Sequence, residues 1–165
     1  IRLNILGRNN KNANKEKDIF KSFLSDKDFQ YIENKNNYSQ YSEIENHNLL
    51  VFLDSSLGYE AIARNIKICC FSIRGSVLGI EKNDMNFGWP GKFDNSGFFW
   101  TNKKNFNQFE MIANQVYDIS QKEWSIKIQN LSSELMNYSK QNQIFFDYLN
   151  ENDVRVKLKP KNKDD

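Results

Sequence analysis

The chain has 165 residues, of which 39% are hydrophobic, 14% are aromatic and 27% are charged, and its formal net charge is +2. A chain of this length buries a sizeable core without help from disulfides or a metal. It contains no run of about 18 apolar residues, which excludes a membrane-spanning helix. The Lys and Arg side chains form no stripe outside the last dozen residues, which argues against nucleic acid as a partner.

The cysteine and histidine content excludes several chemistries. Cys69 and Cys70 are adjacent and would point to opposite faces of a strand, so we expect them to be reduced core residues of a cytosolic protein. His47 is the single histidine, which leaves almost no material for histidine-based metal sites or catalytic triads. The chain starts at Ile1 inside an apolar run, and we interpret it as a domain cut from a longer protein.

The first quarter of the chain alternates between strand and helix patterns. Residues 1–8 alternate apolar and polar side chains and predict the opening strand of a sheet. After a polar loop, the spacing of apolar residues over 19–24 predicts a helix. A brief second strand is expected at 29–32 and a short helix over 38–44.

A strand, a helix and a second strand follow within about 25 residues. The continuous apolar run 49–53 predicts a strand buried on both faces of a parallel sheet, at the centre of the fold. A helix over 55–63 and an apolar strand over 66–73 complete a right-handed βαβ unit. The side chains expected in the core are Leu50, Phe52, Ile68 and Phe71.

The remainder of the chain is mostly helical. The Gly- and Asn-rich segment 74–97 is too long for a plain connector, so we interpret it as functional, and 97–101 is expected to be a last short strand. Helical spacing recurs over 109–117, 124–135 and 144–149. The fold class is therefore α/β: a three-layer Rossmann-like sandwich with a mainly parallel sheet of about five strands and a helical C-terminal third. We expect one domain over 1–150 and a charged, flexible tail over 151–165.

The turn at 54–61 carries most of the chemical information. Ligands of open α/β sheets bind beyond the carboxyl ends of the strands, where free N–H groups at a helix start favour an anion. Ser55 and Ser56 are suited to cap the helix and to donate hydroxyls to a phosphate. Gly58 removes a Cβ where a diphosphate would press, and Glu60 lies within reach of a ribose.

Simpler interpretations of the same residues remain open. The serines are then caps only, and Glu60 pairs with Arg64 one helical turn later. Arg8 and Arg74 both end predicted strands, and each is either a bidentate phosphate ligand or a solvated strand-end arginine. A set of aromatic residues either lines a wall for stacking against a base or sugar or is packed in the core: Trp89, Phe98, Phe99 and Trp100.

Several segments together resemble the carboxyl-terminal domain of GT-B glycosyltransferases, most closely the branch that acts in bacterial surface-carbohydrate biosynthesis. They are YSQY at 38–41, LVFLDSSLGYEAIAR at 50–64, FSIR at 71–74, FGWPG at 87–91 and GFFWT at 97–101. Members of the branch carry an S-T-x-G-Y-E-A type turn followed by a strand and an Arg. Ser56 stands here where Thr is commoner, which keeps the hydroxyl, and the likeness extends from about Ile1 to Leu149.

The resemblance implies that this chain is the donor-binding half of a glycosyltransferase that uses a nucleotide-sugar, without a metal or a cofactor. The donor-binding residues would be Arg8, Ser55, Ser56, Gly58, Glu60 and Arg74. Acceptor recognition and the catalytic base would belong to an absent N-terminal half, so no catalytic residue is assigned and the fragment alone is expected to be inactive. The helix dipole and an Arg would stabilise the charge of the leaving group.

The resemblance also sets expectations about location and partners. We expect a cytoplasmic protein that lies at the inner face of the cytoplasmic membrane. The full-length protein would contact that membrane peripherally. The expected partners are the nucleotide-sugar and the N-terminal acceptor domain. Related turns with the same Glu occur in sugar-nucleotide epimerases. An epimerase-like domain, or a non-catalytic α/β nucleotide- or sugar-binding or regulatory module, is therefore the alternative.

Overall fold

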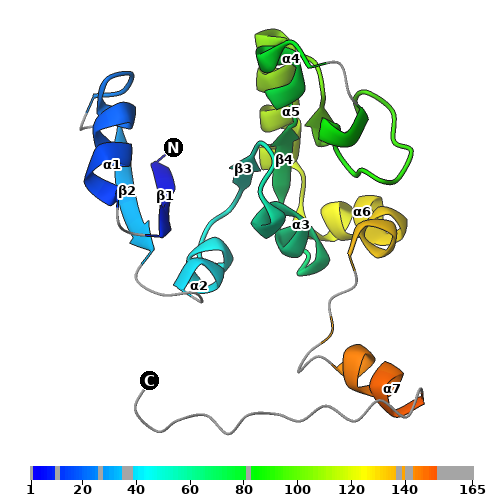
Figure 1. Cartoon of the computed structure of the whole chain (residues 1–165). Coiled ribbons are helices and arrows are strands. Elements are labelled where there is room, and N and C mark those ends of the chain that lie inside the picture. Colours follow the sequence, from blue (N-terminus) through cyan, green and yellow to red (C-terminus); the bar gives the residue numbers. More distant parts are fainter. Residues whose placement is uncertain are drawn as a thin grey trace, which may run out of the picture.

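The computed structural model describes residues 2–9, 12–25, 28–34, 39–80, 83–136, 139 and 143–151. Strands and helices alternate along the chain in a Rossmann-like α/β fold, as the sequence predicts (Figure 1). The five strands of the described residues form two parallel sheets, with orders β1-β2 and β3-β4-β5, where the sequence analysis expected a single sheet. Strand periodicity predicts each strand but not its neighbours, so this division could not be read from the pattern.

The smaller sheet is a parallel pair with one helix against it. Strand β1 (Leu3–Asn9) pairs with β2 (Phe29–Asn34), and α1 (Ala13–Lys21) connects them. The Tyr31 hydroxyl on β2 donates a 2.6 Å hydrogen bond to the Glu16 carboxylate on α1. Burial and this carboxylate raise the pKa of Tyr31 to about 12, so the phenol stays protonated and fastens the helix to the pair.

The larger sheet has three parallel strands. They are β3 (Leu50–Phe52), β4 (Ile68–Phe71) and β5 (Trp100–Thr101). Helix α2 (Ser39–Glu45) precedes β3, and α3 (Ser56–Ala63) connects β3 to β4 as the predicted βαβ unit.

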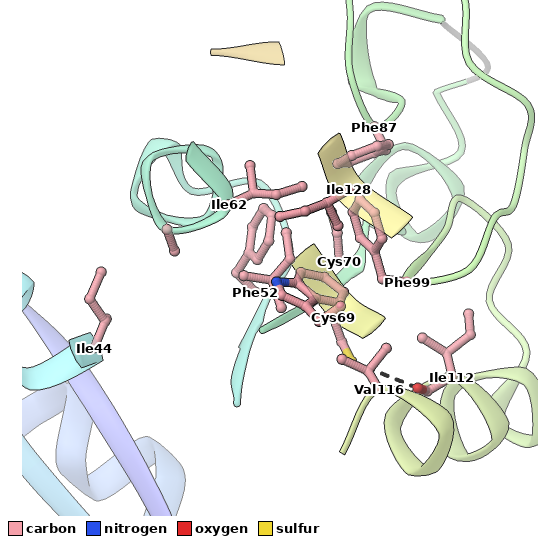
Figure 2. Close-up of a cluster of buried hydrophobic side chains, with 13 residues drawn as sticks. Ile44, Phe52, Ile62, Cys69, Cys70, Phe87, Phe99, Ile112, Val116 and Ile128 are labelled. Atoms are coloured by element: carbon pink, nitrogen blue, oxygen red, sulfur yellow. Dashed lines mark hydrogen bonds between the residues drawn. The ribbon is translucent and has the colours of Figure 1, made fainter. Parts of the chain in front are cut away.

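Helices cover both faces of this sheet. Phe52 of β3 is in register with Cys70 of β4, so both side chains share one face, and α3 packs on Phe52 through Gly58. Cys69 points to the other face, where its Sγ lies 4.0 Å from a main-chain oxygen of α5 (Phe106–Asp118). The helix–sheet–helix layering of the sequence prediction is visible around these side chains in Figure 2.

The core is apolar and aromatic. Its buried members include Ile62, Phe87, Phe99, Ile112, Val116, Trp124 and Ile128 (Figure 2). Of the predicted core residues, Phe52 and Ile68 are buried, and Leu50 and Phe71 are half-buried against the cluster. Both cysteines are free and buried, as predicted, and burial raises the pKa of Cys69 to about 12 and raises that of Cys70 as well.

The prediction that β3 is the central strand, buried on both faces, is wrong. Val51 and Leu53 are 53% and 51% exposed, and β3 lies at the edge of the three-stranded sheet. Strand β4 is central, and its residues Ile68, Cys69 and Cys70 are 0% exposed. An apolar run indicates that a strand can be buried. How far it is buried depends on which strands pair with it and which distant segments pack on it.

The C-terminal third is helical, as predicted. After α4 (Arg74–Leu78) and the 3-10 turn η1 (Asn83–Met85), helix α5 is followed by α6 (Gln121–Leu135) and α7 (Gln143–Glu151). The predicted flexible tail falls almost wholly on 152–165, which lie outside the described residues. In the part of the chain that the structure describes, no helix has the length and apolar character needed to cross a membrane.

Candidate functional site

A pocket opens where β3 and β4 end. Its volume is about 270 Å³. The lining residues come from the β3 end, α3, the β4 end and the following loop, and they are Asp54, Tyr59, Ser72, Arg74, Asp84, Met85, Asn86 and Trp89. The carboxyl ends of parallel strands are where open α/β sheets bind their ligands. The pocket therefore occupies the place at which the sequence analysis expected a site.

An ion pair lies at the rim of this pocket. Asp54 follows β3, and Arg74 is the first residue of α4. Arg74 Nη1 donates to Asp54 Oδ2 over 2.6 Å, and both side chains are partly exposed, at 61% for Arg74 and 39% for Asp54. A guanidinium carries five N–H donors, so this contact orients Arg74 and leaves it donors for an anion. Arg74 is the predicted site residue that lines the pocket itself.

Two part-buried hydrogen bonds of hydroxyl groups hold the loop against the sheet. The Tyr59 hydroxyl accepts a 3.0 Å hydrogen bond from the main-chain N–H of Gly88, and the Ser72 hydroxyl donates a 2.7 Å hydrogen bond to the main-chain oxygen of Met85. Burial raises the pKa of Tyr59, so the phenol is neutral at physiological pH. These contacts join α3 and the β4 end to the 83–89 segment and give the pocket a fixed wall.

Most of the aromatic side chains around the pocket are packed against other residues, and Trp89 is exposed. Phe87 is 1% exposed and stacks on Tyr59, with ring centroids 5.7 Å apart, and on Trp100 at 4.9 Å. Phe99 is also buried, and Phe98 lies under the Lys127 ammonium at 4.5 Å. A stacking wall made of all four predicted aromatics is therefore not formed. Trp89 lines the pocket and is 58% exposed.

The predicted serines lie beside the pocket, at the start of α3. Ser55 is the N-cap, and its hydroxyl accepts a 3.3 Å hydrogen bond from the main-chain N–H of Leu57. Ser55 and Ser56 are exposed and follow the pocket residue Asp54 directly. The capping role of Ser55 is thus observed, and both serine side chains are exposed to solvent. Arg8 belongs to β1, but its side chain lies outside what the structure describes.

Gly58 and Glu60 occupy different faces of α3. A Cβ on Gly58 would lie 2.4 Å from ring atoms of Phe52, so the glycine lets the helix approach β3 closely. Glu60 is half-exposed and does not line the pocket. Arg64, its partner in the simpler interpretation, donates to Glu45 over 2.8 Å.

The pocket combines carboxylates, hydroxyls and one aromatic face. Its ionisable side chains other than the neutral Tyr59 are Asp54, Asp84 and Arg74, with formal charges that sum to −1. Within the described residues, no group of three or more His, Cys, Asp or Glu side chains could hold a metal ion. Carboxylates accept hydrogen bonds from hydroxyl and amino groups, so this lining suits a ligand rich in such donors.

Sequence reasoning missed several lining residues. Ser72 was part of the quoted segment FSIR but was given no role there. Asp84, Met85 and Asn86 belong to no motif, and they reach the pocket because the chain after β4 folds back over the sheet. A pattern confined to neighbouring residues does not report such a return. Tyr59 was part of the quoted turn, but its contact with Gly88 arises 29 residues later in the chain.

Comparison with known protein families identifies the chain's relatives. A family model described as "putative O-antigen biosynthesis protein" matches residues 1–153. The chain belongs to this family. The predicted connection with bacterial surface-carbohydrate biosynthesis is thereby confirmed, because O-antigen is such a carbohydrate. No curated protein and no solved structure matches the chain.

Proposed function

We propose that this member of the O-antigen biosynthesis family is the donor-binding half of a GT-B glycosyltransferase and binds a nucleotide-sugar. The observation that carries the proposal is the position of the pocket, at the carboxyl ends of β3 and β4 and beside the start of α3. Transfer of sugars from activated donors is the chemistry by which surface carbohydrates are built, so the family assignment supports the same conclusion.

The start of α3 would bind the phosphates of the donor. Its first N–H groups and the positive end of the helix dipole favour an anion, and Ser55 and Ser56 present exposed hydroxyls at the same place. Arg74 lines the pocket and pairs with Asp54, the residue before Ser55, and it would give the diphosphate a charged donor. Gly58 contributes by allowing α3 to sit close to β3.

Glu60 would bind the ribose of the nucleotide. It lies one turn into α3. Along the chain, Ser55 and Ser56 come between it and the pocket residue Asp54. A carboxylate suits two vicinal hydroxyls, because its two oxygens accept from both. We include Arg8 as a further phosphate ligand, since it lies near the carboxyl end of the parallel strand β1.

In the reaction, this half would hold the donor and stabilise the leaving group. As the bond to the sugar breaks, negative charge grows on the nucleotide phosphate, and Arg74 with the α3 dipole would stabilise it. The base that activates the acceptor would come from the N-terminal half. The chain alone is therefore expected to bind the donor but to transfer no sugar.

The test is a calorimetric screen of the chain against UDP, GDP, CMP, dTDP and their sugars. The proposal predicts a preference for one nucleotide. Charge-assisted hydrogen bonds contribute about 1.5–3 kcal/mol, so Glu60→Gln should weaken that ligand roughly tenfold to a hundredfold. Glu45→Gln is the matched control, because Glu45 pairs with Arg64 away from the pocket. It should leave the affinity unchanged.

A second pair of variants separates the phosphate site from the ribose site. The double variant Ser55→Ala and Ser56→Ala should weaken the nucleotide-sugar and the nucleotide diphosphate more than the bare nucleoside, because the hydroxyls act on the anion. Equal binding of all nucleotides, or none, would contradict the proposal and would favour the non-catalytic module.

A further inference from the structure

One large aromatic side chain at the pocket is left unpacked by the fold. Trp89 is 58% exposed, although its neighbour Phe87 is 1% exposed and belongs to the core cluster. Among the residues that line the pocket, Trp89 offers a broad apolar face on which the ring of a ligand can stack.

The loop that carries Trp89 is firmly attached. The N–H of Gly88 donates to the Tyr59 hydroxyl at 3.0 Å, and the N–H of Trp89 donates to the Asn86 oxygen at 3.3 Å. Phe87 is clamped between Tyr59 and Trp100. The backbone on the N-terminal side of Trp89 is thus fixed by the core, and the indole is presented to the pocket without a further cost in ordering the loop.

The two carboxylates of the pocket favour a sugar ring beside them, while the remaining donors of Arg74 stay available to the phosphates. Asp54 and Asp84 outnumber Arg74 among the charged lining residues, and one nitrogen of Arg74 pairs with Asp54. Two carboxylates repel a phosphate group but accept hydrogen bonds from hydroxyl or amino groups. A ring that has such groups on its edge and C–H bonds on its face matches this lining, because its face can pack on the indole.

We infer that the pocket is the subsite for the sugar ring of the donor, with the ring stacked on Trp89 and its hydroxyl or amino groups bonded to Asp54 and Asp84. This assignment rests on the proposed function and deepens it. It also places the sugar ring beside the start of α3, where Ser55 and Ser56 would hold the phosphates. A sugar that carries a free amine would be bound better than its neutral analogue, because the pocket has a net negative charge.

Trp89 supplies a direct readout of occupancy. Acrylamide quenching of tryptophan fluorescence should report mainly on Trp89, because Trp124 is 0% exposed and Trp100 is half-buried. The probes are UDP, GDP and dTDP, compared with UDP-N-acetylglucosamine, GDP-mannose and dTDP-glucose. A nucleotide-sugar that binds should protect the indole from acrylamide, and the matching nucleotide diphosphate should not.

Calorimetry on variants completes the test. Trp89→Ala should weaken the bound nucleotide-sugar at least tenfold and its nucleotide diphosphate less than twofold, and Trp89→Phe should recover part of the loss. Circular dichroism checks that each variant is folded. If Trp89→Ala weakens both ligands equally, or if a bound nucleotide-sugar leaves the indole unprotected, the sugar subsite is refuted while the proposed function stands. If no nucleotide or nucleotide-sugar binds the wild-type chain, the proposed function fails and this inference fails with it.

Discussion

Replacing Gly58 with alanine tests how closely α3 is held against β3. The missing Cβ would lie 2.4 Å from three ring atoms of Phe52, and Phe52 is 7% exposed. Ordinary carbon contacts lie near 3.5–4.0 Å, so the ring or the helix must move by about 1 Å. The ring cannot move freely, because it also packs edge-on against Tyr59, with centroids 5.8 Å apart.

The expected magnitude follows from two opposing effects. Overpacking a core costs about 1–3 kcal/mol, and the required shift places this site in the upper part of that range. Alanine is better than glycine in a helix by about 1 kcal/mol. We therefore expect Gly58→Ala to lower the free energy of unfolding by about 1–2 kcal/mol. In a chain of this size, that loss corresponds to a fall in Tm of roughly 2–8 °C.

Urea unfolding followed by circular dichroism measures the effect in a double-mutant cycle. Phe52→Leu removes the ring that the new methyl group meets, so the double variant should be more stable than the sum of the two single losses by about 1 kcal/mol. If Gly58→Ala is as stable as the wild type, or if the two losses simply add, α3 is not positioned by this contact.

Three further predictions concern parts of the fold around the site. Asp54→Asn should change the free energy of unfolding by under about 1 kcal/mol, because its pair with Arg74 is partly exposed, and a loss above about 2 kcal/mol in urea would show that the pair is structural. Ser120→Ala removes the hydroxyl of the capping box of α6 and should lower the free energy of unfolding by about 1 kcal/mol in urea. An unchanged free energy of unfolding would show that this cap does not stabilise the helix. Stability should fall as pH rises from about 9 toward about 12, because unfolded thiols ionise near pH 9 while burial keeps Cys69 and Cys70 protonated in the folded protein. Replacing both cysteines with alanine should flatten this part of the pH profile, and an unchanged profile would assign the loss to other groups.

The sequence predicted the elements well because their patterns are local. The period of apolar residues located β1, α3, β4 and the C-terminal helices within a few residues of their observed bounds. The burial of β3 was overestimated, because an apolar run gives no information about which strand is the edge. That is decided by pairing with residues far along the chain, as with the parallel register of Leu50 and Ile68.

The candidate site was predictable only where its residues are contiguous. Asp54 and the start of α3 follow directly from a strand and a cap signal, and Arg74 follows from a strand end. Asp84 and Trp89 join them through long-range contacts such as the bond from Ser72 to the Met85 oxygen, which no spacing rule reports. The packing role of Gly58 was also hidden, since it depends on the Phe52 ring.

Calorimetric titration of the Arg74→Ala variant with the preferred nucleotide-sugar tests the donor-site claim most directly. Arg2→Ala is the matched control, because Arg2 is exposed and bonds to Gln30 in the β1-β2 pair, away from the pocket. Arg74→Ala should weaken binding roughly tenfold to a hundredfold, since it removes charge-assisted hydrogen bonds to the phosphates, while Arg2→Ala should leave the affinity unchanged. Equal affinities for the wild type and Arg74→Ala would show that donor phosphates do not bind at the carboxyl ends of β3 and β4.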